Sequence, residues 1–445
     1  MIILHITSHL GGGVGKVISN ICSYEQKLKS EYKHKIILLE EPEKTQYINI
    51  AKLSGVEIII KPSRKILEKE LKDADIVQIE WWHHPIMCNF LYDFPKIPVR
   101  LIIWSHISGC SYPFVRKNFL MNCNRFLFTS PYSLENPYLK EKDVMKFINK
   151  KTDVVYSSGG FNNITTQKNI VGNTFNIGYV GTLNLCKLNP DFISYCNSVN
   201  IPNCKFIMVG DASIKDNILN EARKKHIYEK FEFVGYTDDV KSQLNRMDVF
   251  GYPLNPQHYG TTENALLEAM AAGIPPVVLN QCAEKYIVKN METGIIVNNA
   301  REYGEAIEYL YNNPNEKVRI GINARKYVID NLGMKNTIYN LNKNYDLTMK
   351  DDKKIISFKS VLGDTPAEWF LSCFGKKSKA FKESMDINSI TKEQSKSIQQ
   401  EILKILSNIK ILKENNKSSL FHFARYFPED KWLKYWKDLF EKAYY

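Results

Sequence analysis

The chain has 445 residues, 44% of them hydrophobic and 24% charged, and its formal net charge is +12. This length exceeds one ordinary core, so two or three domains are expected, and the hydrophobic content excludes global disorder. The positive charge predicts contact with an acidic membrane surface or with phosphorylated small molecules, and lysine-rich solubility is the alternative. The aromatic-and-basic pattern of RNA-binding modules does not occur, so no nucleic-acid partner is expected.

The cysteines and the hydrophobic runs indicate the cellular compartment in which the protein is expected. Nine cysteines are scattered singly, without CxxC pairs or histidines at zinc-ligand spacing, so we expect buried thiols in a reducing compartment. The N-terminal run shows no basic leader and no cleavage site, and no stretch has the length of a membrane span. These features predict a cytoplasmic protein that is able to bind the inner face of the membrane peripherally.

The first part of the chain alternates short β-branched runs with longer amphipathic stretches. This pattern is typical of βαβ units around a parallel sheet that is buried on both faces. The expected strands are Ile2–Ile6, Lys35–Leu39, Val56–Ile60, Ile76–Ile79, Arg100–Trp104, Arg125–Thr129 and Asp153–Tyr156. They predict a Rossmann-like domain over residues 1–168.

The alternation restarts after a polar stretch rich in asparagine and threonine. The expected strands of the second part are Phe175–Val180, Lys205–Val209, Phe231–Val234, Val249–Tyr252, Pro276–Leu279 and Gly294–Val297. They predict a second Rossmann-like domain over residues 169–335. A helix over residues 336–350 is expected to return towards the first domain.

Residues 351–445 show only helical patterns. Thr391 and Gln394 predict a capping box, and isoleucines follow at helical spacing up to Ile409. A second apolar stripe runs from Trp432 to Leu439. We expect these stripes to pack on the protein's own body, and a membrane or partner contact is the alternative.

A glycine-rich loop follows the first strand. In the run Gly11–Lys16, Gly12 and Gly13 let the backbone approach a ligand and aim helix N-terminal amides at an anion. The loop is not a Walker A motif, because Leu10 and Val17 stand where that motif needs a glycine and a hydroxyl side chain. A tight turn without a ligand is the alternative.

The second predicted domain opens in the same way. Gly181 and Thr182 follow its first strand and lead to Lys187. A lysine at this distance from a glycine-rich loop can neutralise a diphosphate without a metal ion. A solvated surface lysine is the alternative.

The most informative segment covers residues 259–278. Thr261 or Thr262 is expected to cap a helix, on which Thr261, Asn264 and Glu268 share one face. A carboxylate there can accept both hydroxyl groups of a ribose, and the helix N-terminus can face a phosphate. A solvated glutamate on an amphipathic helix is the alternative.

This order of motifs resembles the retaining glycosyltransferases of family 4, also called group 1. The resemblance covers roughly Met1 to Lys350. Beside the first glycine-rich loop it rests on Ala74–Gln78, Gly181–Lys187, Val209–Asp211, Val234–Tyr236, Asp248–Phe250, Leu267–Ala271 and Glu292–Gly294. It implies the GT-B architecture of two facing Rossmann-like domains with parallel sheets, here followed by an α-helical C-terminal extension.

The resemblance assigns roles to individual residues. Glu268 corresponds to the second glutamate of the family's E-x7-E motif, which holds the donor ribose. The first glutamate would stand eight residues earlier, where this chain has Gly260, and Glu263 is the candidate replacement. Lys187 corresponds to the phosphate-binding lysine, whereas its usual arginine partner is Thr182 here.

The remaining roles belong to loops of both predicted domains. His106 corresponds to a histidine that approaches the donor sugar, and a structural histidine is the alternative. The run Glu80–Pro85 is expected to line the acceptor side or to pack internally. The other expected donor-binding residues are Gly12, Gly13, Gly181, Tyr236, Gly260, Thr261, Thr262 and Asn264.

The resemblance implies a hexosyltransferase of the EC 2.4 class that needs no metal ion and no cofactor. It would transfer a sugar, with retention, from a nucleotide diphosphate sugar, preferably a UDP-sugar, to a glycan, lipid-linked or protein acceptor in polysaccharide biosynthesis. Lys187, with the amides of Gly12, Gly13, Thr261 and Thr262, would stabilise the departing diphosphate.

Two alternative functions stay open. One is a nucleotide-sugar epimerase of the same architecture, which needs no acceptor. The other is a catalytically impaired scaffold that binds a partner through its basic tail over residues 351–445. The tail is also the part expected to contact an anionic membrane or a protein partner.

Overall fold

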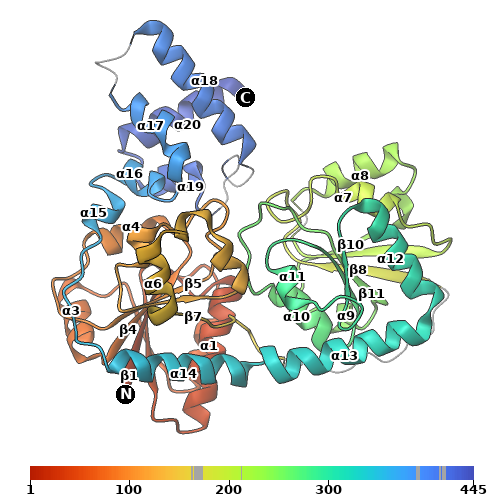
Figure 1. The fold of residues 1–445 in the computed structure, drawn as a ribbon, viewed down its shortest axis with the longest axis horizontal. Helices are drawn as coiled ribbons and strands as arrows, with labels where there is room; N and C mark the ends of the chain where they lie inside the picture. The colour runs from red at the N-terminus through yellow and green to blue at the C-terminus, as the bar shows by residue number, and fades with distance from the viewer. Residues whose placement is uncertain are drawn as a thin grey trace. The chain divides into compact units, whose positions relative to one another are not determined.

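The computed structural model describes residues 1–161, 164, 174–211, 213–386, 391–409, 412 and 417–444. These residues form two compact units, shown in Figure 1. Unit 1 comprises Met1–Val155 and Ile338–Tyr445, and unit 2 comprises Tyr156–Thr337. The boundary predicted between residues 168 and 169 lies outside the described residues.

Unit 1 contains a parallel seven-stranded sheet in the order β3-β2-β1-β4-β5-β6-β7. Its strands are β1 (Ile2–Thr7), β2 (Lys33–Leu38), β3 (Glu57–Ile60), β4 (Ile76–Trp81), β5 (Leu101–Ser105), β6 (Arg125–Phe128) and β7 (Thr152–Val154). All seven predicted strands are present, and their ends differ from the prediction by at most two residues. The strand order reverses between β1 and β4, and ligands of open α/β sheets bind beside such a point, outside the carboxyl ends of the strands.

Helices connect these strands. They are α1 (Gly12–Lys27), α2 (Gln46–Leu53), α3 (Arg64–Asp73), α4 (Pro85–Tyr92), α5 (Lys117–Leu120) and α6 (Lys142–Lys151). The long helix α14 (Met334–Met349) begins in unit 2 and ends in unit 1. The strands β1, β4 and β5 form the centre of the unit and bury both of their faces.

Unit 2 repeats the arrangement with six parallel strands in the order β10-β9-β8-β11-β12-β13. The strands are β8 (Phe175–Val180), β9 (Cys204–Val209), β10 (Phe231–Gly235), β11 (Val249–Tyr252), β12 (Pro276–Leu279) and β13 (Ile295–Val297). Its helices are α7 (Phe192–Asn197), α8 (Lys215–Lys224), α9 (Val240–Leu244), α10 (Asn264–Ala271), α11 (Glu284–Ile287), α12 (Ala300–Asn312) and α13 (Pro314–Leu332). The predicted fold class of two Rossmann-like sheets followed by a helical region is confirmed.

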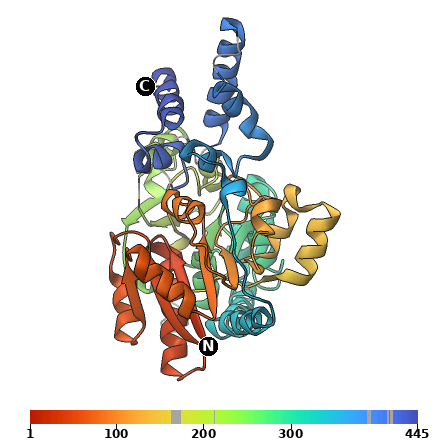
Figure 2. The same ribbon diagram turned by 90° about the vertical axis from the view of Figure 1, so that its left-hand side faces the viewer.

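The C-terminal extension is helical and belongs to unit 1. Its helices are α15 (Lys359–Leu362), α16 (Pro366–Leu371), α17 (Lys379–Ser384), α18 (Lys392–Asn408), α19 (Leu420–Tyr426) and α20 (Lys431–Tyr444). Figure 2 shows these blue helices beyond one end of the red and orange part of the unit, where α15, α16 and α19 contact α4. Within the described residues, no helix combines the length and the apolar character needed to cross a bilayer.

The apolar stripes of the extension pack on the protein itself. The predicted capping box of Thr391 and Gln394 is present at the start of α18. α18 buries Ile402 and Ile405, and α20 buries Trp436 against Phe381, with ring centroids 5.0 Å apart. The expectation of internal packing is therefore confirmed for these two helices.

The extension also holds the loop after β4. The hydroxyl of Ser418 lies 3.1 Å from the carbonyl oxygen of Trp82 and 3.0 Å from that of His83. A ring nitrogen of His83 lies 3.2 Å from the carbonyl oxygen of Trp369. The side chains of Trp81, Trp82, His83 and His84 are all buried. Of the two interpretations of this run, the structure supports internal packing.

Candidate functional site

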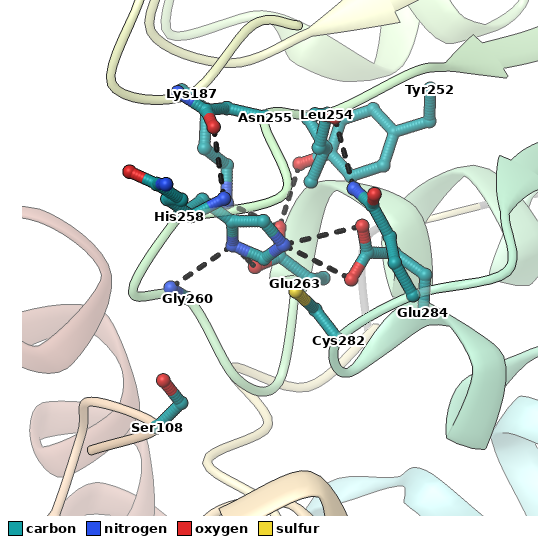
Figure 3. A network of polar contacts seen from close by, with 12 residues as sticks. Ser108, Lys187, Tyr252, Leu254, Asn255, His258, Gly260, Glu263, Cys282 and Glu284 are labelled. Atoms are coloured by element: carbon teal, nitrogen blue, oxygen red, sulfur yellow. Dashed lines mark hydrogen bonds and ion pairs between the residues drawn. The ribbon is translucent and has the colours of Figure 1, made fainter. Parts of the chain in front are cut away.

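Several of the residues predicted to bind the donor in unit 2 lie outside the carboxyl ends of β8 and β11. These two strands are neighbours where the strand order reverses, so the loops that follow them meet at one edge of the sheet. The loop after β8 carries Lys187, and the loop after β11 carries His258, Gly260 and Glu263. In Figure 3, Lys187, His258 and Glu263 point towards one another.

An ion pair between Lys187 and Glu263 forms the centre of this group. The ammonium nitrogen of Lys187 lies 2.5 Å from Oε2 of Glu263, and 22% of the lysine side chain but only 2% of the glutamate side chain is exposed. The hydroxyl of Tyr252 donates a second hydrogen bond of 2.9 Å to the same oxygen. Burial alone would raise the pKa of Glu263, but the charges of Lys187 and His258 and the two hydrogen bonds lower it, so Glu263 is ionised.

The other carboxylate oxygen of Glu263 is less well satisfied. Oε1 is buried and has no hydrogen-bond partner among the described residues, although Nδ1 of His258 lies 3.6 Å away. A buried oxygen of this kind is costly unless a ligand or water supplies a donor. Glu263 also has a left-handed backbone with a φ of 50°. Backbone strain at a non-glycine residue is concentrated at functional sites.

The absence of a side chain at Gly260 makes room for this pair. A Cβ atom at Gly260 would lie 2.0 Å from Oε1 of Glu263 and 2.8 Å from the ammonium nitrogen of Lys187. No residue larger than glycine fits there while Glu263 keeps its position. The carboxylate of Glu263 thus occupies the space into which a side chain at position 260 would project.

The start of α10 differs from the sequence-based prediction. Neither Thr261 nor Thr262 caps this helix: it begins at Asn264, its N-cap residue is Glu263, and no side chain caps it. Thr261 therefore lies outside the helix and does not share a helical face with Asn264 and Glu268. The prediction failed because the Glu263 side chain turns away to Lys187 and Tyr252 instead of binding the first helical amides.

Two of the predicted donor-binding residues, Thr262 and Asn264, contact residues 157–159 at the start of unit 2. The amide of Ser157 donates a hydrogen bond of 2.9 Å to the hydroxyl of Thr262. Asn264 accepts from the amide of Gly159 at 2.9 Å and donates to the carbonyl oxygen of Ser157 at 3.0 Å. In this structure the two side chains hold residues 157–159 against the start of α10.

His258 connects Glu263 to a second buried carboxylate. Its Nε2 lies 3.1 Å from Glu284 at the start of α11, and both side chains are fully buried. Burial lowers the pKa of His258, but the charge of Glu284 and the hydrogen bonds of the ring with Cys282 and Glu284 outweigh this effect and raise the pKa to about 10. The backbone amide of Gly260 donates a hydrogen bond of 3.1 Å to Nδ1 of His258, and this contact disfavours a proton on Nδ1. Lys187, Glu263, His258 and Glu284 therefore form a row of alternating basic and acidic groups.

The other predicted residues of unit 2 lie in varied environments. Gly181 follows β8 with a φ of 152°, and a Cβ atom at Gly210 would lie 1.9 Å from its carbonyl oxygen, so the two loops pack closely. Thr182 is exposed. Tyr236 is 60% exposed, and its hydroxyl donates to Asp238. Glu268 is half-buried on α10.

The predicted residues of unit 1 lie outside the carboxyl ends of β1 and β5. Gly12 and Gly13 are the first residues of α1, and a Cβ atom at either position meets nothing within 4 Å, so open space lies above this turn. Gly12 has a φ of 63°, which favours glycine. His106 follows β5, and its Nε2 lies 2.7 Å from Oε2 of Glu80.

Three groups among the described residues bring histidine, cysteine or glutamate atoms close enough to bind a metal ion. They are His5 with Cys22 and His34, His9 with Glu40 and His84, and His258 with Cys282 and Glu284. The ring nitrogens of His5 and His34 already hydrogen-bond to Glu80, Glu25 and each other. Nδ1 of His9 and Nδ1 of His84 accept backbone amide hydrogens. These contacts would compete with metal ligation.

Sequence reasoning missed Tyr252, His258 and Glu284. The only signal for His258 is its place two residues before Gly260 in the loop after a predicted strand. Tyr252 ends a strand, and Glu284 stands 26 residues beyond its partner His258. No spacing rule connects residues that only the packing of neighbouring loops brings together.

A family model described as "Glycosyl transferases group 1" matches residues 161–327, which nearly coincide with unit 2. Over these residues the chain is similar to the group 1 glycosyltransferases. The suspected resemblance is thereby confirmed. The Lys187–Glu263 pair and its surroundings lie inside the matched range.

The curated proteins that match this chain are distant relatives. The O-antigen biosynthesis glycosyltransferase WclY of Escherichia coli is 29% identical over 75 residues, which are 17% of this chain and 20% of that protein. The capsular polysaccharide biosynthesis glycosyltransferase CapM of Staphylococcus aureus is 27% identical over 165 residues, which are 36% of this chain and 42% of that protein. The matches span less than half of these relatives.

Solved structures resemble the fold over a longer stretch. Anabaena HepE in complex with UDP-glucose is 14% identical, with a TM-score of 0.61, and covers 78% of this chain and 99% of that chain. A variant of S. aureus TarM in complex with UDP and other ligands is 11% identical, with a TM-score of 0.59, and covers 78% of this chain and 100% of that chain. These likenesses show the fold, which is of the GT-B class.

Proposed function

We propose that this protein is a retaining glycosyltransferase that uses a nucleotide diphosphate sugar, preferably a UDP-sugar. The observation that supports this most strongly is the ion pair of Lys187 and Glu263 beside Gly260, within the group 1 domain. A nucleotide diphosphate leaving group gains negative charge as the sugar–phosphate bond breaks, and a fixed cation stabilises this charge. UDP or UDP-glucose in the solved relatives supports uridine as the preferred base.

Lys187 is proposed to bind the diphosphate. An ammonium group has three N–H donors, and its hydrogen bond to Glu263 engages one of them, so others can reach phosphate oxygens. Glu263 holds the lysine at the edge of the sheet and is proposed to replace the first glutamate of the E-x7-E motif. Glu268 is proposed to hold the donor ribose. No metal ion is required in this scheme, because the cation is supplied by the chain.

The acceptor is proposed to be a glycan, lipid-linked or protein group of a cell-surface polysaccharide. The names of WclY and CapM, which refer to O-antigen and capsular polysaccharide biosynthesis, support this class. We propose a cytoplasmic location, in which the basic extension is available for an anionic membrane surface or a protein partner.

The first test is thermal unfolding of the full chain with UDP, GDP or ADP in the presence of EDTA, with Glu268→Ala alongside. A ligand at one hundred times its dissociation constant adds about 2.7 kcal/mol of stability. Stabilisation of the wild type by UDP, lost in the variant, would support the donor site and its independence from metal. Absence of any response would overturn the placement of Glu268 and favour the scaffold alternative.

A second measurement separates transfer from epimerisation. The protein is incubated with UDP-glucose alone, and UDP, free sugar and epimeric UDP-sugar are quantified. Slow release of UDP without an epimer is the expected result for a transferase that lacks its acceptor. Formation of an epimeric sugar would favour the epimerase.

A further inference from the structure

A row of ionisable side chains crosses the core of unit 1 beneath His106. The row passes from His106 after β5 to Glu80 on β4, His5 on β1, His34 on β2 and Glu25 on α1. Nε2 of His106 lies 2.7 Å from Oε2 of Glu80, and Nδ1 of His5 lies 2.8 Å from Oε1 of Glu80. Nε2 of His5 lies 2.8 Å from Nδ1 of His34, whose Nε2 contacts Glu25.

The row is closed to solvent. The side chains of His5 and Glu80 are 1% and 0% exposed, and those of His34 and Glu25 are 2% and 3% exposed. The side chain of His106 is 3% exposed. Apolar side chains of similar volume would avoid the desolvation cost of such a layer, so packing alone does not explain it.

The proton count links the members to one another. Four contacts join the five side chains, and each contact needs one proton between its two heavy atoms. Burial by itself raises the pKa of Glu80, but hydrogen bonds from His106 and His5 and their charges lower it to about 2, so Glu80 only accepts. His106 and His5 therefore donate to Glu80, and one further proton joins His5 to His34. Burial lowers the pKa of His34 against the opposing hydrogen bond of Glu25, so these two share the last proton.

Other groups face the row from neighbouring elements. Gln78 on β4 donates to Oε1 of Glu80 at 2.8 Å, and the hydroxyl of Tyr345 on α14 donates to Gln78 at 2.8 Å. Asn342 on α14 donates to Glu25 at 2.6 Å. The thiol of Cys22 on α1 is buried beside Glu80 and Glu25, which with burial raise its pKa. The hydroxyl of Tyr32 donates to Asp346 near the same end of the row.

We propose that Glu80 is a positioning residue that fixes the tautomer of His106, and that Glu80, His5, His34 and Glu25 form one shared-proton network that transmits a change at Glu25 to His106. Glu80 accepts a hydrogen bond from Nε2 of His106 and thereby holds a proton on that ring nitrogen. The role of His106 at the donor sugar rests on the proposed function, whereas the network itself does not. α14 contacts the network near both ends, through Tyr345 and Asn342.

The test uses the full chain with ¹⁵N-labelled histidine, and NMR reads the ring-nitrogen tautomer of each histidine. His106→Gln and His5→Gln spectra assign the signals. In the wild type we expect the proton of His106 on Nε2, and in Glu80→Gln we expect this tautomer to be lost or mixed. A pure Nε2 tautomer in Glu80→Gln would overturn the positioning role.

Glu25→Gln tests whether the row acts as one network. It lies four contacts from His106, so altered ring-nitrogen shifts of His106 are expected only if protons are shared along the row. Unaltered shifts would overturn the network. Glu70→Gln is the matched control, because Glu70 is a buried glutamate of the same unit that pairs with Lys35 instead. It should leave His106 unchanged.

A catalytic readout distinguishes this proposal from the proposed function. Release of UDP from UDP-glucose is followed against pH, and Glu80→Gln is expected to lower kcat at least 10-fold and displace the pH profile, with KM within about 2-fold. Loss of the His106 tautomer with an unchanged kcat and pH profile would overturn the catalytic relevance of Glu80. If the NMR results are as expected but the wild type neither binds nor turns over UDP-glucose, the proton network is supported and the proposed transferase function is rejected.

Discussion

Each unit buries a row of ionisable side chains beneath the carboxyl edge of its sheet, and the two rows end differently. In unit 1 the row consists of histidines and glutamates, and each of its side chains is at most 3% exposed. In unit 2 the row ends on Lys187, which is 22% exposed, and the next member, Glu263, keeps one buried oxygen without a hydrogen-bond partner in the described part of the chain. A closed row suits the positioning of a side chain, and an open row suits the binding of a ligand.

The open end of the unit 2 row is the place where the largest effect is expected. Lys187→Ala should lower the rate of UDP release from UDP-glucose about 10²–10³-fold, because it removes the cation proposed to stabilise the leaving group. It also leaves Glu263 buried without its partner. Steady-state kinetics provide the measurement, and Lys187→Arg, which keeps the charge, is the matched variant. Full activity of Lys187→Ala would refute the proposed role of this lysine.

The closed row of unit 1 should appear as a stability difference in acid. The pKa of Glu80 is lowered to about 2 in the folded protein. Its contribution to the free energy of unfolding is therefore present above its pKa in the unfolded chain, about 4.5, and is lost as the pH falls towards 2. At pH 6 Glu80→Gln should therefore cost about 3 kcal/mol, and the difference should shrink towards pH 2.

Urea unfolding followed by tryptophan fluorescence measures this effect in unit 1, because all six tryptophans of the chain lie there. Glu70→Gln serves as the control. If Glu80→Gln lowered the free energy of unfolding by the same amount at pH 6 and pH 2, the network would not be stabilising the ionised form of Glu80.

The row of unit 2 has the opposite pH dependence through His258. The pKa of His258 is raised to about 10 in the folded protein. Its contribution to the free energy of unfolding is therefore complete below its pKa in the unfolded chain, about 6.5, and is lost as the pH rises through 10. His258→Gln should therefore remove at most about 4 kcal/mol at pH 7 and far less at pH 10.

Hydrogen exchange of unit 2 peptides at several pH values measures this loss. The exposed His226, changed to asparagine, is the control in the same unit. Equal protection of wild type and His258→Gln at pH 7 would indicate that the Gly260 amide keeps His258 neutral.

The smallest expected effect comes from adding one methyl group to the open row. Gly260→Ala places a Cβ atom 2.0 Å from Oε1 of Glu263, so the carboxylate must move. A displacement of this size near the reacting atoms should lower kcat about 10-fold. Gln257→Ala, at an exposed position of the same loop, should have no effect. Unchanged kinetics of Gly260→Ala would argue against Glu263 as the replacement glutamate.

The strands could be predicted well from the sequence, and the site only in part. β8, β11 and β12 have the predicted ends because short β-branched runs between polar loops are a local signal. Lys187 and Glu263 were both expected near the donor, but their direct contact was not. The cap of α10 was predicted wrongly, because a long-range ion pair overrides the local preference of threonine for that position.

The sequence by itself determined the two parallel sheets, the helical extension and the order of motifs that marks a group 1 glycosyltransferase. Only the tertiary structure decided which ionisable side chains meet. Glu80 and His106 are separated by 26 positions, and Lys187 and Glu263 by 76. Periodicity acts over a few residues, whereas contacts at the edge of a sheet depend on which strands are neighbours and on how their loops pack.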